Sequence, residues 1–162
     1  VRALCRDPGA FEGDTRPGDL EDPRAMADAA AGCEVVLNAA GIVDPEAHPR
    51  ALKWTHVAGM ENLIKACRHA GVSRLVPVSC TDVTLANHDR VHWDELKPVP
   101  GEPFGARARS LQLAADLALS ASSPELATLS LRPAWVWGPG DTSRLPQLCE
   151  EALDGGIRMR PK

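Results

Sequence analysis

The sequence predicts an α/β protein in which a parallel β-sheet is covered by helices on both faces. Short apolar stretches with strand character alternate along the chain with longer segments of helical periodicity. Loops of moderate length separate these stretches, which is typical of parallel strands joined by helical crossovers. The 162 residues are 44% hydrophobic, which is enough apolar material for the core of one domain.

The first strand and the first helix are expected before residue 31. Residues 1–5 are apolar except for Arg2 and end at a polar turn, which predicts a strand. Residues 23–30 are expected to be a helix, because Asp22 can accept hydrogen bonds from its first turn and Pro23 is favoured at the first helical position.

Two strands and a long helix are expected in the middle of the chain. Residues 33–37 read as a buried strand. Residues 51–70 have apolar side chains every three or four positions, and Gly71 is expected to end this helix. Residues 74–79 read as a strand, although Pro77 removes one donor from its ladder.

The last part of the chain begins with a polar stretch at residues 82–105, which reads as a long loop. A helix is expected at residues 107–120 and a strand at residues 127–131. Residues 147–153 are expected to be a short helix capped by Gly155.

Composition excludes several classes of partner. The net charge of −4 and the pI near 5.7 argue against nucleic-acid binding, which relies on clustered positive charge. No apolar run approaches the about 20 residues that cross a bilayer, so we expect no membrane partner for this segment. The five cysteines are odd in number, lie far apart and include no Cys-x-x-Cys pair, which favours a reducing, cytoplasmic compartment.

Two segments carry specific motifs. Residues 131–141 read Leu-Arg-Pro-Ala-Trp-Val-Trp-Gly-Pro-Gly-Asp, and residues 57–67 read Val-Ala-Gly-Met-Glu-Asn-Leu-Ile-Lys-Ala-Cys. Both resemble motifs of extended short-chain dehydrogenase/reductases, specifically the 3β-hydroxysteroid dehydrogenase and NAD-dependent epimerase/dehydratase group, and the likeness runs nearly end to end. His56 stands where this family usually has Asn.

The resemblance implies a Rossmann-type, doubly wound parallel sheet that is incomplete at the N-terminus. The family's first strand and its glycine-rich turn, which bind the cofactor diphosphate, would precede Val1. Residues 1–162 are therefore expected to be a partial NAD(P)-binding domain whose substrate-binding C-terminal region is largely absent.

The resemblance also implies a set of cofactor-binding residues. The loop at residues 131–141 brings backbone groups to the nicotinamide in the family, and Pro133 and Val136 inherit this role by position. Asp19, followed by Leu20, matches the aspartate that accepts a hydrogen bond from the adenine amino group. A turn of small residues is expected to pass close to the ribose and diphosphate. These residues are Ala39, Ala40 and Gly41.

The end of the first strand bears on cofactor preference. An acidic residue there accepts hydrogen bonds from both ribose hydroxyls and selects NAD, whereas a basic residue pairs with the 2′-phosphate of NADP. Cys5 occupies the acidic position and Arg6 follows it. The sequence therefore favours NADP, and NAD stays open.

The catalytic residues of the family are incompletely represented. Its members use a Tyr-x-x-x-Lys pair for proton transfer and a Ser or Thr to hold the substrate oxygen. This chain has no Tyr. Cys80 stands at the usual Ser position, and Thr81 beside it is the better hydrogen-bond donor, so these two are the catalytic candidates.

Two alignments of the missing pair stay open. In one, Phe104 takes the Tyr position and Ala108 the Lys position; in the other, Arg107 and Leu111 do. Neither alignment supplies a group that exchanges protons at neutral pH, because Phe has no ionisable proton and Arg keeps its own.

Three histidines are candidates to replace the missing acid/base, and each reads more readily as solvated or structural. They are His56, His88 and His92. Two roles also stay open for Trp135 and Trp137, which could line a substrate cleft or pack within their own loop.

Two functions follow from this reading. The first is an NAD(P)-dependent oxidoreductase or epimerase-family protein that transfers hydride at a hydroxyl or keto carbon of a small molecule. The second is a catalytically silent dinucleotide-binding or regulatory domain, favoured by the missing Tyr. A homodimer stays open as a further partner.

Overall fold

The strands of this computed structural model are all paired in parallel. The model describes residues 1–44, 46–85, 94–95, 97, 99, 101–141 and 144–154. In this part of the chain β1 (Arg2–Cys5) pairs with β2 (Asp14–Pro17), while β3 (Val35–Asn38) pairs with β4 (Arg74–Pro77) and β4 with β5 (Ala127–Thr128). The expected parallel α/β fold is therefore confirmed.

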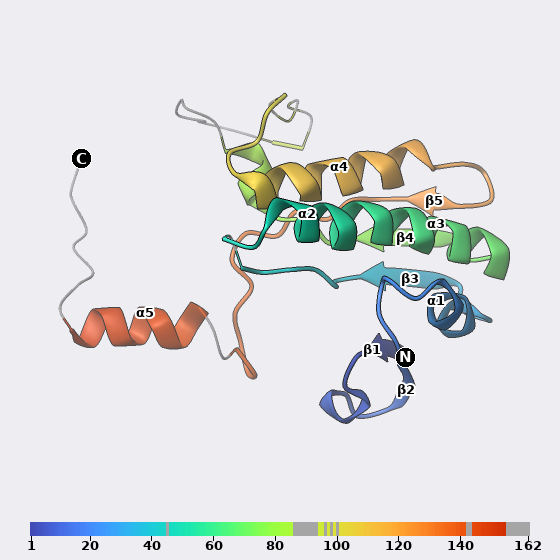
Figure 1. The fold of residues 1–162 in the computed structure, drawn as a ribbon, viewed down its shortest axis with the longest axis horizontal. Coiled ribbons are helices and arrows are strands. Elements are labelled where there is room, and N and C mark those ends of the chain that lie inside the picture. Colours follow the sequence, from blue (N-terminus) through green and yellow to red (C-terminus); the bar gives the residue numbers. More distant parts are fainter. Residues whose placement is uncertain are drawn as a thin grey trace.

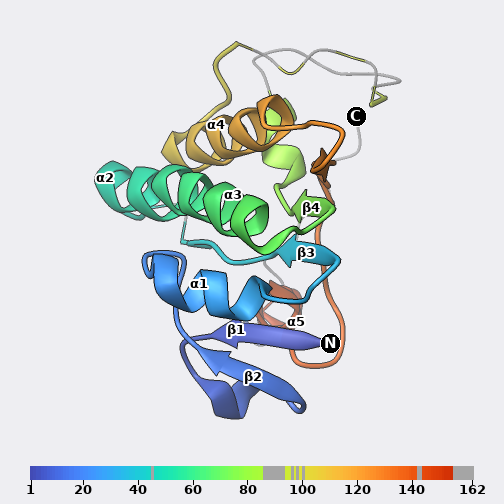
Figure 2. The same ribbon diagram turned by 90° about the vertical axis from the view of Figure 1, so that its right-hand side faces the viewer.

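The strands form two sheets rather than one. β1 and β2 make a two-stranded sheet, and the other three described strands make a second sheet in the order β3-β4-β5. Among the described residues no ladder joins β1 to β3, and Figure 2 shows the two sheets one below the other with α1 alongside both.

Helices alternate with these strands. They are α1 (Pro23–Ala30), α2 (Pro49–Leu52), α3 (Gly59–Ala70), α4 (Ala106–Ser120) and α5 (Arg144–Leu153), with a π-helical turn η2 (Lys53–Ala58) and short 3-10 turns η1 (Pro8–Ala10) and η3 (Thr81–Thr84). Figure 1 shows this order along the chain, with α5 standing apart from the other helices.

The capping residues expected from the sequence are in place. Asp22 accepts hydrogen bonds from the backbone N–H groups of Arg24 (2.9 Å) and Ala25 (3.1 Å), so α1 starts where predicted. Gly71 ends α3 in the left-handed conformation (φ 70°, ψ 28°), which a residue with a Cβ adopts at a cost.

The helix expected at residues 51–70 is more elaborate than its periodicity predicts. α2 runs into η2 and then into α3 without a break in the helical course. The π-helical turn gives no signal in the spacing of apolar residues, but such turns are frequent at functional sites.

One hydrophobic core lies between the helices and the strands. Met26 of α1, Cys67 of α3, Ala118 of α4 and Leu75 of β4 are at most 1% exposed and belong to the same cluster. Figure 2 shows α1, α3 and α4 stacked on one side of the strands. Burial of this face is the main favourable term for folding.

The opposite face of the β3-β4-β5 sheet is open in the described structure. Val35 and Leu37 of β3 are 47% and 61% exposed, and Leu129 and Leu131 after β5 are 58% and 43% exposed. The expectation of a buried strand at residues 33–37 is therefore wrong for this face, because only the alternate residue Val36 packs against the core.

Smaller differences concern the ends of elements. β5 is shorter than expected, although Leu131 still forms a parallel bridge with Val78. The stretch expected as a long loop opens with η3, and most of its middle lies outside the described residues, as does Gly155.

All five cysteines are free thiols. In the described ranges no helix is both long enough and apolar enough to cross a membrane, and no three His, Cys, Asp or Glu side chains gather in a way that could hold a metal ion.

The one-sided core predicts that two strand leucines differ in their effect on stability. Leu75→Ala should lower the free energy of unfolding by about 2–5 kcal/mol, because it leaves a cavity where the side chain is fully buried. Leu37→Ala, the matched control on the open face, should change it by less than about 0.5 kcal/mol. Urea unfolding of both variants measures this, and equal losses would contradict the one-sided core.

Candidate active site

The loops that follow the strands leave from one edge of each sheet, because the strands are parallel. Backbone hydrogen bonds tie neighbouring strand ends together. Gly18 N donates to Cys5 O (3.1 Å) across β1 and β2, and Val78 N donates to Asn38 O (2.8 Å) across β3 and β4. The residues predicted for the site follow these strand ends.

Arg6 and Asp19 lie together at the end of the β1-β2 sheet. Arg6 Nε is 3.5 Å from Asp19 Oδ2, and the Arg6 side chain is 87% exposed. An exposed pair of this kind contributes about 0–1 kcal/mol, so a ligand phosphate could compete for the guanidinium at little cost. The structure thus brings together the two residues predicted to meet the adenosine end of a cofactor.

The turn between Arg6 and α1 has no spare room. A Cβ on Gly18 would lie 2.5 Å from Ala25 Cβ and 2.7 Å from Leu4 Cδ1, so only glycine fits. Leu20 is 6% exposed and its side chain packs in the core beside Gly59. Of the predicted binding residues, Leu20 therefore has only its backbone available for a ligand.

The loop after β3 carries small, exposed residues. Asn38 Oδ1 accepts a hydrogen bond from Ala40 N (3.2 Å), which turns the chain at once after the strand. Ala39, Ala40 and Gly41 are exposed. These three residues are small, and the close approach of a cofactor to this loop stays a prediction.

His56 connects this loop to α4. Its Nε2 accepts from Ile42 N (3.0 Å), and its Nδ1 lies 2.7 Å from Ser110 Oγ, which donates to Arg107 O (2.8 Å). The ring is 4% exposed. Burial, and then the positive charge of Arg107, lower the pKa of His56 below its ordinary value of 6.5.

Arg107 occupies the centre of the site. Its Nη1 lies 3.6 Å from Cys80 Sγ and 3.3 Å from Asp82 Oδ2, and its Nε donates to Ile42 O (3.1 Å). Phe104, by contrast, is 76% exposed. Of the two alignments left open by the sequence, the geometry therefore favours Arg107 over Phe104 at the position where the family has Tyr.

Thr81 joins the site to the loop after β5. Its N–H donates to Pro133 O (3.2 Å), and its carbonyl accepts from Thr84 Oγ1 (2.7 Å). Pro133 is thereby held beside the two catalytic candidates, Cys80 and Thr81.

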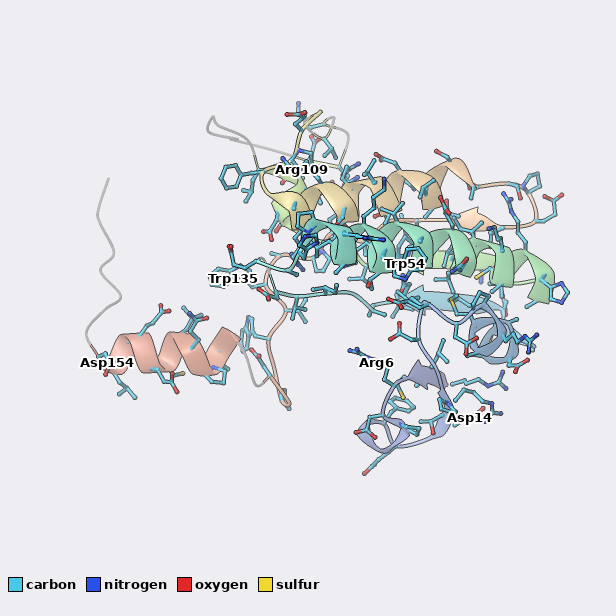
Figure 3. All side chains as sticks on the ribbon, in the orientation of Figure 1. Arg6, Asp14, Trp54, Arg109, Trp135 and Asp154 are labelled. Carbon is cyan, nitrogen blue, oxygen red and sulfur yellow. The ribbon has the colours of Figure 1, made fainter. Side chains whose placement is uncertain are left out.

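The remainder of the loop after β5 is exposed. Trp135, Val136 and Trp137 are 61%, 75% and 71% exposed, and Figure 3 shows Trp135 projecting outward near the segment that leads to α5. The sequence left open whether the two tryptophans pack into their own loop, and their exposure shows that they do not. Val136 and the two tryptophans present apolar surface at the site edge.

The side chains of this arrangement can bind an oxygen or an anion, but Arg107 cannot exchange a proton. Arg107 stays protonated at neutral pH, so it can hold an oxygen or an anion but cannot act there as a general acid. The Cys80 thiol and the Thr81 hydroxyl are the groups that could hold a substrate oxygen. Their catalytic role stays a prediction.

Two members of this network were not singled out as site residues from the sequence. Ser110 and Asp82 are short polar side chains whose partners are distant along the chain. The signal that could have identified Ser110 is its place one turn after Arg107 on a helix face of alanines. His88 and His92 lie outside the described residues.

Comparison with known sequences identifies relatives over almost the whole chain. Residues 11–160 match the 3-beta hydroxysteroid dehydrogenase/isomerase family. The chain is 36% identical over 144 residues to a 2-alkyl-3-oxoalkanoate reductase of Stenotrophomonas maltophilia, covering 88% of this chain and 44% of the relative. It is 32% identical over 147 residues to the sterol-4-alpha-carboxylate 3-dehydrogenase, decarboxylating, of Saccharomyces cerevisiae, covering 88% and 42%.

Solved structures agree with the fold. MoeE5 in complex with UDP-glucuronic acid and NAD superposes with a TM-score of 0.77 at 27% identity, covering 96% of this chain and 54% of that one. A dTDP-glucose 4,6-dehydratase of Streptomyces venezuelae with NAD bound has a TM-score of 0.75 at 24% identity, covering 91% and 48%, and supports the fold alone.

The likeness is extensive in this chain but partial in its relatives. The chain spans less than half the length of the curated relatives named above. The match nevertheless covers both motif segments and the whole network around Arg107. This chain therefore belongs to the 3-beta hydroxysteroid dehydrogenase/isomerase family, within the extended short-chain dehydrogenase/reductases.

Proposed function

We propose that this chain is the nucleotide-binding part of an NAD(P)-dependent oxidoreductase or epimerase-family protein. Its substrate would be a small molecule with a hydroxyl or keto carbon, at which the bound nicotinamide supplies or accepts hydride. The observation that carries the proposal is the convergence of the small-residue loop, Cys80 and Arg107 around Ile42.

The residues present fit a dinucleotide. Ala39 to Gly41 leave an exposed stretch of backbone without bulky side chains, which suits close approach of a ribose and diphosphate. Arg6 and Asp19 would meet the adenosine end, and Pro133 and Val136 the nicotinamide end. The relatives whose printed names describe reductases also support a keto substrate.

NADP is the proposed cofactor, with NAD as the competing one. The support is the exposed guanidinium of Arg6, which can pair with a 2′-phosphate after leaving Asp19. Solved relatives are described with NAD, so the preference of this chain needs a direct test.

The chain is proposed to act as part of a longer domain. β1 and β3 present facing edges without a described partner, while α1 packs against β1, β2 and α3. A further parallel strand between β1 and β3 would join the two sheets into one, and it would carry the glycine-rich turn that the family uses for the diphosphate. A separate substrate-binding region would then follow residue 162.

A catalytically silent dinucleotide-binding or regulatory domain is the second candidate function. The observation that favours it is Arg107 beside Cys80, at the position where the family has its proton-transferring Tyr. A protein of this kind would bind the cofactor without turning over an alcohol or ketone.

A second copy of the chain is the proposed protein partner. Trp54 is 59% exposed and lines an outer groove with Arg50, Lys53, Val57, Ala58 and Glu61. A two-fold axis at Val57 would place Lys53 of one copy opposite Glu61 of the other, since both lie equally far from Val57 along the chain. The groove is thus complementary in charge to itself.

Free thiols throughout the chain support a reducing, cytoplasmic location.

Restoring the proton-transfer pair should separate the two functions. The double variant Arg107→Tyr/Leu111→Lys returns the Tyr-x-x-x-Lys pattern at the alignment that the structure favours. If the chain retains an otherwise competent site, NADPH-dependent reduction of a ketone panel by a version extended at both ends should rise by about 10²–10⁴-fold. The control is Phe104→Tyr/Ala108→Lys, which restores the pattern at the exposed alignment. Cofactor binding without a gain in either variant would favour the silent domain.

Arg6 should decide the cofactor preference. Arg6→Ala is expected to weaken NADPH binding by about 10-fold or more and to leave NADH binding unchanged, because only NADPH carries a 2′-phosphate. Fluorescence titration of the extended version measures both affinities, and Arg24→Ala on the exposed side of α1 is the control. Equal weakening of both cofactors would contradict a phosphate contact.

Trp54 should control self-association. Trp54→Glu places a charge in the groove and is expected to shift a dimer toward monomer by about 10-fold or more in dissociation constant. Analytical ultracentrifugation measures the change, and Trp135→Glu is the matched exposed control. A wild-type chain that stays monomeric at high concentration would exclude the groove as an interface.

A further inference from the structure

Ile42 ends the small-residue loop, and side chains hold both of its backbone groups. Its N–H donates to His56 Nε2 (3.0 Å), and its carbonyl accepts from Arg107 Nε (3.1 Å). Asn38 at the start of the loop is held by its carbonyl, which accepts from Val78 N (2.8 Å). The loop is therefore pinned at both ends, while the three residues between them stay exposed.

The hydrogen bonds around His56 select one tautomer. Nε2 accepts from Ile42, so it carries no proton, and the proton of the neutral ring must lie on Nδ1. Nδ1 donates to Ser110 Oγ (2.7 Å), and Ser110 in turn donates to the Arg107 carbonyl (2.8 Å). Each donor in this chain of bonds has an acceptor, which fixes the orientation of the ring.

Protonation would break this arrangement. An imidazolium has no acceptor, so a proton on Nε2 would face the Ile42 N–H. The ring is buried, and the cation facing it is Arg107 of α4, which is itself paired with Asp82 of η3. Both burial and Arg107 disfavour a second positive charge and keep the pKa of His56 below its ordinary value.

Charges on the other elements packed around η2 lie elsewhere. Arg50 of α2, Lys53 of η2 itself and Glu61 of α3 line the outer groove with Trp54, and His56 is not part of that groove. Among the described groups, Arg107 is the charge that acts on the ring, and Asp82 reaches the ring only through its pair with Arg107.

We propose that His56 is a positioning residue for the dinucleotide, whose neutral ring holds the Asn38–Ile42 loop in its binding conformation and whose protonation releases it. The cofactor part of this inference rests on the proposed function, whereas the clamp on Ile42 does not. An Asn at this position, as the resemblance implies for the family, would not titrate near neutral pH. Release of the Asn38–Ile42 loop at acidic pH would then be a property of this chain.

The test compares two substitutions of His56 in the extended version. His56→Gln keeps an acceptor oxygen and does not titrate, whereas His56→Phe keeps a ring and removes both nitrogens. At pH 7.5 we expect His56→Phe to weaken NADPH binding by about 10-fold or more, and His56→Gln by no more than about threefold. The control is His69→Gln, an exposed histidine on α3.

The pH profile carries the sharper expectation. Wild-type affinity for NADPH should fall once the pH drops below the folded-state pKa of His56, which lies under 6.5, and it should fall more steeply than that of His56→Gln, because protonation of the 2′-phosphate affects both proteins alike. The free energy of unfolding should behave likewise. The unfolded chain takes up a proton that the folded ring resists, so wild-type stability is complete above pH 6.5 and declines below it. His69→Gln should follow the wild type in both measurements.

Two readouts on the 162-residue chain need no cofactor. Nitrogen NMR of the ring should show the proton on Nδ1, and amide hydrogen exchange at Ile42 should accelerate in His56→Phe but not in His69→Gln. A proton on Nε2, unchanged exchange at Ile42, or identical pH profiles for wild type and His56→Gln would overturn the proposal. Failure of the extended wild type to bind NADPH or NADH at any pH would overturn the proposed function and leave the clamp on Ile42 standing.

Discussion

Parallel pairing of the strands is the constraint on which the site depends. It sends the loops after β3, β4 and β5 to the same edge, where backbone hydrogen bonds join Asn38 to Val78 and Pro133 to Thr81. The core on one side of the sheet supports this edge, since α3 and α4 both pack in it, while η2 and α4 contribute the side chains of His56, Arg107 and Ser110 to the network. Residues far apart in sequence, among them those predicted to bind the cofactor, thus meet at one edge of the sheet.

The network around Ile42 shows how the family pattern is altered without loss of local order. Arg107, which one of the two alignments places at the family's Tyr position, satisfies the Ile42 carbonyl, contacts Cys80 and pairs with Asp82. His56 satisfies the other backbone group of Ile42. The substituted residues therefore preserve the shape of the loop while they change the chemistry that the site can offer. This combination supports cofactor binding, and only a turnover measurement distinguishes an enzyme from a silent domain.

The open surfaces of the structure support the proposal that the chain acts as part of a longer domain. The face of the β3-β4-β5 sheet that bears Leu37 and Leu131 is apolar and exposed, and the facing edges of β1 and β3 have no described partner. Such surfaces are costly to leave in water.

Local signals in the sequence determined most of the elements. Asp22 and Pro23 predict the start of α1, Gly71 predicts the end of α3, and the alternation of strand and helix predicts parallel pairing, because each of these depends on neighbours in sequence. The prediction that certain loops bind a cofactor came from motif resemblance. Only the tertiary structure decided that residues 33–37 are half exposed, that Arg107 rather than Phe104 meets Cys80, and that Ser110 orients His56. These outcomes depend on which helix covers which face and on contacts between residues many positions apart, and no local pattern encodes either.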